Sequence, residues 1–91
     1  MIEHNSIKPR IQAFIAHTFP AAKKRSLHDD VPLLEAGIID SLGVLDVVAF
    51  LEKTFTIKIA DEELTPDNFA NIRCLATFVE QKRNQAEVPS P

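Results

Sequence analysis

The stretch SLGVLDVVAFLEKTF, residues 41–55, constrains the fold of this chain more than any other part of the sequence. Its apolar residues recur at helical spacing, so we predict one α-helix over the whole stretch. The side chains predicted to face inward are Leu45, Val48, Leu51 and Phe55. Further apolar residues widen the surface well beyond one stripe: Leu42, Val44, Val47, Ala49 and Phe50. A helix with so much apolar surface either is central to a core or offers an exposed patch to a partner.

An earlier segment has the same periodicity. Asn5 or Ser6 can cap a helix there, and Pro9 is compatible with its first turn. The apolar stripe of this helix consists of Ile7, Ile11, Phe14, Ile15 and Phe19. We expect Pro20 to end it.

A third helical segment lies near the end of the chain. Asn71 can cap it, and Lys82 and Arg83 are cations suited to its C-terminus. Its apolar stripe consists of Ile72, Leu75, Ala76 and Val79.

The connections between these helices differ in kind. Residues 20–40 form a long loop, which in a compact domain needs anchors or a function. The anchors that we expect are Leu33, Leu34, Ile38 and Ile39. Residues 56–59 alternate apolar and polar side chains, so this segment is predicted to be extended, with Ile57 and Ile59 buried. Thr65 and Pro66 are a cap and a first helical residue, which predicts a short helix through Phe69.

These elements predict an all-α fold. It is a four-helix bundle with three longer helices, one short helix and a long loop between the first and second helices. A chain of 91 residues buries too little surface for two independent cores. We therefore expect a single, monomeric domain at residues 1–83, followed by a flexible C-terminal tail at residues 84–91.

Charge is distributed unevenly along the chain. The formal net charge is -3, but residues 40–69 alone contain seven acids and two bases. A partner that docks on this region should present Lys and Arg side chains. The basic run Lys23, Lys24, Arg25 is short and precedes Asp29 and Asp30, so a solvated loop is a better interpretation than a nucleic-acid site.

Several other functions find no support in the sequence. Cys74 is the only cysteine, so no intramolecular disulfide can form, and we expect it to be a packing residue in the last helix. His4, His17 and His28 have no metal-ligand spacing, and no metal site is predicted. No apolar run predicts a membrane span or a signal peptide, so a cytoplasmic location is expected.

The polar pair Asp40-Ser41 lies just where the second helix begins. Either residue could be its N-cap, which contributes roughly 1 kcal/mol. The reciprocal capping box is absent, because Gly43 and Val44 cannot reach back as Glu or Gln would. Capping therefore explains one of the two polar residues better than it explains both.

A serine hydroxyl at a helix N-terminus also suits a phosphate ester, since free N–H donors and the helix dipole favour negative charge there. A hydrolase would need a base near Ser41, which His28 or His17 would have to supply. The nucleophile-elbow pattern is missing, because Ile39 stands where its first glycine belongs. A serine that is modified therefore fits better than a catalytic one, and no catalytic residue is predicted.

The stretch LEAGIIDSL, residues 34–42, followed by an apolar helix and FTIKI at residues 55–59, resembles the acyl carrier and peptidyl carrier protein family. The likeness runs from the first helix to about Arg83. It implies that Ser41 of the Asp-Ser-Leu triplet receives a 4'-phosphopantetheine arm from coenzyme A, transferred by a separate phosphopantetheinyl transferase. The thiol of the arm then carries an acyl or aminoacyl group as a thioester, so the protein is a shuttle rather than an enzyme.

The resemblance also implies roles for the neighbours of Ser41. Asp40 would lie at the transferase contact, and Leu42 and Val44 would flank the arm as part of the docking surface. Plain core packing is the alternative for these two apolar residues. Asp46 and Glu52 would meet basic residues of partner enzymes, and a solvated face is the alternative for both.

One difference from the family's fatty-acid-synthesis pattern indicates which kind of carrier this sequence resembles. Carriers of fatty-acid synthesis commonly continue Asp-Ser-Leu with an acid and Thr, whereas this chain has Gly43 and Val44. The sequence is therefore more similar to discrete carriers of secondary metabolism or to the D-alanyl carrier group. Such a carrier would be loaded by an acyl- or aminoacyl-activating ligase and would deliver its cargo to an acyltransferase or synthase. The alternative function is a helical interaction module in which Ser41 is only an N-cap.

Overall fold

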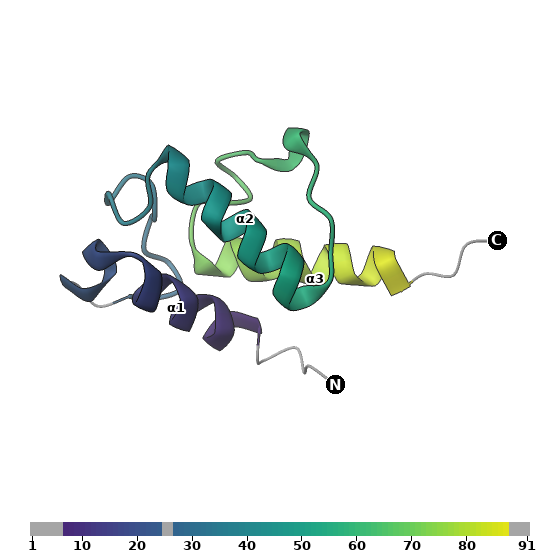
Figure 1. The fold of residues 1–91 in the computed structure, drawn as a ribbon, viewed down its shortest axis with the longest axis horizontal. Helices are drawn as coiled ribbons and strands as arrows, with labels where there is room; N and C mark the ends of the chain where they lie inside the picture. The colour runs from purple at the N-terminus through teal and green to yellow at the C-terminus, as the bar shows by residue number, and fades with distance from the viewer. Residues whose placement is uncertain (1–6, 25–26, 88–91) are drawn as a thin grey trace.

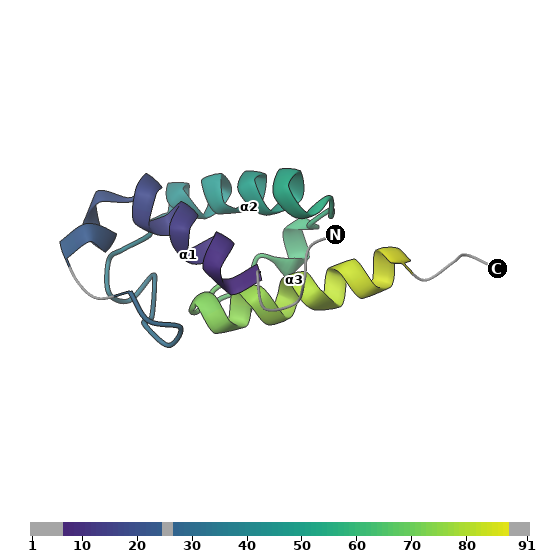
Figure 2. The same cartoon turned by 90° about the horizontal axis from the view of Figure 1, so that it is seen from below.

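The computed structural model describes residues 7–24 and 27–87, and within them the chain is helical, with no strand. Three α-helices form the fold: α1 (Ile7–Thr18), α2 (Ser41–Phe55) and α3 (Ile72–Glu87). α1 packs on both α2 and α3, and Figures 1 and 2 show the three helices enclosing one core. The all-α architecture predicted from the sequence is confirmed. No helix in the described ranges is both long and apolar enough to cross a membrane.

α1 presents one stripe of its surface to the core. Ile7, Ile11 and Ile15 are fully buried, whereas Phe14 and Phe19 are partly buried at its edge. Pro9 lies in the first turn, where its missing N–H costs no hydrogen bond. The caps expected at Asn5 or Ser6 lie outside the described residues.

The chain leaves α1 through a short 3₁₀ helix, η2 (Pro20–Lys24). The α-helix itself ends at Thr18, two residues before Pro20, as expected. The basic run therefore begins in a 3₁₀ helix rather than in a loop, and Arg25 lies outside the described residues.

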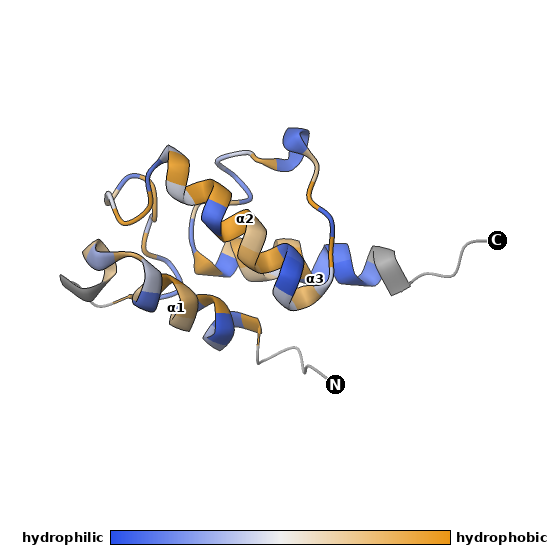
Figure 3. Ribbon diagram, in the orientation of Figure 1, coloured by the Kyte–Doolittle hydropathy of each residue, from blue (hydrophilic) through white to orange (hydrophobic). Residues whose placement is uncertain are grey.

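α2 has the predicted bounds but a different inward face. Its buried residues are Gly43, Val47, Leu51 and Phe55. Val48 is partly buried, and Leu45, predicted to face inward, is 57% exposed. The prediction for Leu45 is wrong because apolar residues surround most of this helix (Figure 3), so spacing alone does not identify the face that packs on α1 and α3.

The long loop is anchored as expected, with one exception. Leu33, Ile38 and Ile39 are buried, whereas Leu34 is 38% exposed. The N–H of Leu33 donates to the carbonyl of Ala70, and the carbonyl of Leu33 accepts from Ile38 and Ile39. These bonds fix the loop to the segment before α3 and bring the chain to the start of α2.

The fourth helix is a minor element and lies earlier than predicted. It is the 3₁₀ helix η3 (Asp61–Glu63), whereas residues 66–69 form only turns. Thr65 caps the turn, because its Oγ1 accepts from the N–H of Asn68 at 3.3 Å. The turn ends there because Phe69 is buried and the Ala70 carbonyl bonds Leu33. The segment at residues 56–59, predicted to be extended, begins instead with Thr56 in the left-handed region, with φ 56°, where it caps the end of α2. Ile57 is buried as predicted, whereas Ile59 is only partly buried.

α3 begins as predicted and ends later. Asn71 caps it through a 2.8 Å hydrogen bond from the Cys74 N–H to its Oδ1. The buried residues of this helix that pack into the core are Ile72, Leu75, Ala76 and Val79. The helix continues to Glu87, so residues 84–87 of the predicted tail are helical, and residues 88–91 lie outside the described residues.

Candidate functional site

The cap of α2 is the Asp40 side chain. Its Oδ1 accepts a hydrogen bond of 2.7 Å from the N–H of Gly43, and its backbone carbonyl accepts one from Val44. Asp40 has the extended backbone of an N-cap, with φ -98° and ψ -176°. The two polar residues at the start of α2 therefore have different roles, because only Asp40 caps the helix.

Ser41 is the first residue of α2 and is exposed. Its side chain makes no hydrogen bond within residues 7–24 and 27–87. The N–H groups of Ser41 and Leu42 precede the first intrahelical bond, so they also lack helical acceptors. A free hydroxyl beside free N–H donors at the positive end of a helix is compatible with a phosphodiester.

Gly43 allows the helix to begin close to the core. An added Cβ would lie 2.8 Å from a ring carbon of Phe19 and 2.9 Å from Cγ2 of Ile39. It would also lie 3.2 Å from the capping oxygen of Asp40. At this position, one of the two departures from the fatty-acid-synthesis pattern, packing therefore disfavours any larger residue, which sequence reasoning did not detect.

An exposed apolar strip follows Ser41 along α2. Leu42 is 75% exposed and Leu45 is 57% exposed, and Ala49 is exposed one turn further on. We call these three residues the α2 strip. Val44 faces away from it and packs, partly buried, against the core. The packing alternative therefore describes Val44, and exposure favours a docking role for Leu42.

The two acids predicted to meet partner enzymes differ in their surroundings. Asp46 is exposed, without an ion pair in the described part of the chain. The Glu52 carboxylate accepts a 2.9 Å hydrogen bond from the N–H of Ile59, which holds the chain as it leaves α2. Glu52 thus has a structural contact that neither the docking prediction nor the solvated alternative included.

Among the described residues, no cluster of side chains supports a catalytic or a metal-binding site. Exposed His17 and His28 make no hydrogen bond to Ser41 in the described ranges. No group of three or more His, Cys, Asp or Glu among the described residues could hold a metal ion. Cys74 is partly buried on α3.

A model of the protein family described as "Phosphopantetheine attachment site" matches residues 10–79. The chain belongs to this family. The matched region spans all of α2, including the exposed serine at its start, most of α1 and the first half of α3. This carrier domain is thus one whose family bears a 4'-phosphopantetheine group.

Curated relatives include carrier proteins of two kinds. The domain is 32% identical over 73 residues to "Probable acyl carrier protein PigG" of Serratia sp. (strain ATCC 39006), covering 80% of this chain and 84% of that one. It is 35% identical over 52 residues to "D-alanyl carrier protein" of Streptococcus pyogenes serotype M5 (strain Manfredo), covering 57% of this chain and 66% of that one. The relatives thus include an acyl carrier and a D-alanyl carrier.

A solved structure supports the fold. A chain in the structure named "Crystal structure of FAD-dependent dehydrogenase" superposes with a TM-score of 0.69 and 32% sequence identity. The match covers 76% of this chain and 97% of that one. The similar chain is therefore almost entirely a domain of this fold.

Proposed function

We propose that Ser41 carries the 4'-phosphopantetheine arm and that the chain serves as an acyl or aminoacyl carrier. One observation carries this assignment: the Ser41 hydroxyl is exposed and unbonded at the start of α2, while the adjacent Asp40 supplies the cap. The arm supplies a thiol that holds the cargo as a thioester. The chain's own residues present the attachment hydroxyl and a docking surface, and no catalytic role is assigned to them.

The alternative, a helical interaction module in which Ser41 only caps, is weakened by the same geometry. It assigned the cap to Ser41, whereas the oxygen that accepts from the Gly43 N–H belongs to Asp40. Loss of the Ser41 hydroxyl should therefore leave the helix end intact. The two functions make opposite predictions for a Ser41 variant.

The test is attachment of the arm. The protein is incubated with coenzyme A, Mg²⁺ and a broad-specificity phosphopantetheinyl transferase, and intact mass is measured. We expect one arm's mass in the wild type and in Thr77→Ala, which removes an exposed hydroxyl from α3. Ser41→Ala should gain no mass, and its free energy of unfolding should lie within about 0.5 kcal/mol of that of the wild type. An unmodified wild type with several active transferases would overturn the assignment.

We further propose partners for this domain. They are the transferase, an acyl- or aminoacyl-activating ligase, and an acyltransferase or synthase. Docking involves Leu42 with the rest of the α2 strip, together with Asp46, and Asp40 lies at the transferase contact. Val44 packs against the core and Glu52 accepts the Ile59 N–H, so neither is assigned to docking. Asp46 is the acid that is free to meet a basic partner. The single domain at residues 1–83, the monomeric state and the cytoplasmic location stay predictions.

We propose that an FAD-dependent dehydrogenase is one downstream enzyme, because the chain of similar fold belongs to a structure named for that activity. Such an enzyme would remove two hydrogens from the tethered acyl group and reduce FAD to FADH2. With the dehydrogenase of that structure and a loaded carrier, we expect flavin bleaching and a matching mass loss in the acyl group. Bleaching that also occurs with an unloaded carrier would contradict this partner.

A further inference from the structure

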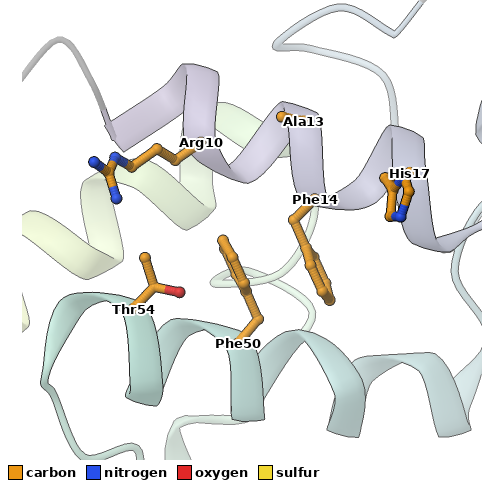
Figure 4. Close-up of a pocket in the computed structure, with 6 residues that line it drawn as sticks. All are labelled: Arg10, Ala13, Phe14, His17, Phe50 and Thr54. Carbon is orange, nitrogen blue, oxygen red and sulfur yellow. The ribbon is translucent and has the colours of Figure 1, made fainter.

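Two hollows flank a pair of stacked rings at the seam between α1 and α2. The larger, of about 620 Å³, is lined by Arg10, Ala13, Phe14, His17, Phe50 and Thr54 (Figure 4). The smaller, of about 480 Å³, is lined by Phe14, Thr18, Asp46, Ala49, Phe50 and Lys53. Both hollows are lined by Phe14 and Phe50, and we call the two together the α1–α2 groove.

The floor of this groove is aromatic and fixed in place. The rings of Phe14 and Phe50 stack with centroids 4.1 Å apart and an interplanar angle of 11°. Phe14 also meets Phe19 edge to face, and Phe50 meets Phe55 in the same way, with centroids 6.1 Å apart in each pair. Phe14 and Phe50 are only partly buried. They therefore offer exposed aromatic surface to a flat apolar group.

One end of the groove is cationic. Figure 4 shows Arg10 and Thr54 at one end of the larger hollow, with the two rings between them and His17. The lining of this hollow contains no carboxylate, and Arg10 forms no ion pair within the described residues. A bound group with a negative charge at this end would be complementary to the Arg10 guanidinium.

The groove also lies along the helix that begins with Ser41. Leu42, Asp46, Ala49 and Lys53 follow one another at the i, i+4, i+7, i+11 spacing of a single helix face. At 1.5 Å per residue, Asp46 lies ~7.5 Å along the axis from Ser41 and Phe50 lies ~13.5 Å from it. A group tethered to Ser41 can therefore follow this face into the groove.

We propose that the α1–α2 groove holds the free end of the group tethered to Ser41 and favours acyl groups with a flat apolar body and a negatively charged end. The body rests on Phe14 and Phe50, and the charge meets Arg10. The cargo thus lies on the surface of the bundle. The core remains closed, in keeping with the complete burial of Leu51 and Val79. This inference rests on the proposed attachment at Ser41.

The test attaches two amide-linked pantetheine analogues to Ser41, one ending in phenylpropionyl and the other in 4-carboxyphenylpropionyl. Attachment is confirmed by mass before NMR spectra are recorded. We expect ring-current shifts at the Ala13 and Ala49 methyls, larger for the acidic analogue, and no shifts at Leu51 and Val79. Shifts confined to the neighbours of Ser41, or shifts at Leu51 and Val79, would overturn the groove. If no analogue attaches, the Ser41 proposal fails as well.

Arg10→Gln tests the charge preference without disturbing the core, because Arg10 is exposed. An exposed ion pair is worth up to about 1 kcal/mol. The preference is the occupancy of the groove by the acidic analogue relative to that by the phenylpropionyl analogue, and this variant should lower it by roughly two- to five-fold. Lys58→Gln removes a matched exposed charge that does not line the groove, and it should preserve the preference. An unchanged preference in Arg10→Gln would exclude Arg10 as the recognising group.

Discussion

Asp40, Ser41 and Gly43 give the start of α2 the geometry that the proposed attachment requires: a capping carboxylate, an exposed hydroxyl and a close approach to the core. The sequence predicted a polar pair at a helix start, because caps depend on neighbouring residues alone. It left open which of the two residues caps, since both side chains are suited to it. It gave no sign of the contacts at Gly43, because Phe19 lies far earlier in the chain and Ile39 lies in the preceding loop, whose course depends on the fold.

A Gly43→Ala variant tests whether packing fixes this glycine. Alanine in a helix interior would stabilise by up to about 1 kcal/mol relative to glycine. Overpacking against Phe19 and Ile39 typically costs about 1–3 kcal/mol, so we expect a net loss of about 1 kcal/mol. Urea unfolding measures it. Ala16→Gly, at a partly buried helical position, is a control that should lose stability through propensity alone. A more stable Gly43→Ala protein would contradict the packing argument.

α2 has two apolar faces with different tasks. The residues at Gly43, Val47, Leu51 and Phe55 are buried, whereas the α2 strip of Leu42, Leu45 and Ala49 faces solvent. Sequence periodicity predicted the helix and its bounds. It placed Leu45 on the wrong face, because only the positions of α1 and α3 determine which side is covered.

A Leu45→Ser variant distinguishes the two faces. Burial of an exposed leucine against a partner is worth about 1.5 kcal/mol, so kcat/KM for phosphopantetheinylation should fall roughly ten-fold. The free energy of unfolding should change by no more than about 0.5 kcal/mol. Leu51→Ala is the matched core variant and should lose about 2–5 kcal/mol. Equal kcat/KM for Leu45→Ser and the wild type would remove Leu45 from the docking surface.

At the scale of the whole molecule, hydrogen bonds between residues distant in the chain determine features of the fold that the sequence did not predict. The three helices and the caps of α2 and α3 were predictable, because periodicity and caps are local. The short fourth helix was placed at Thr65–Phe69, but the chain forms it at Asp61–Glu63. There Glu63 accepts hydrogen bonds from the Ala60 N–H at 2.9 Å and from Lys82 on α3 at 2.9 and 3.1 Å. Lys82 and Glu63 are 19 residues apart, and patterns of local residue spacing do not predict such a contact.

This link makes stability depend on pH. The backbone hydrogen bond from Ala60, followed by the Lys82 side chain, lowers the pKa of Glu63 below its ordinary value of 4.5. A lowered carboxylate pKa stabilises the fold above about pH 4.5 and loses that contribution as the pH falls through the folded-state pKa. We therefore expect Glu63→Gln to unfold more easily than the wild type at pH 7, with the difference shrinking below pH 4.5. Urea midpoints from pH 3 to pH 7 measure this, and Glu62→Gln, an exposed neighbour, is the control. A difference that is constant across this range would mean that the Glu63 charge does not tie η3 to α3.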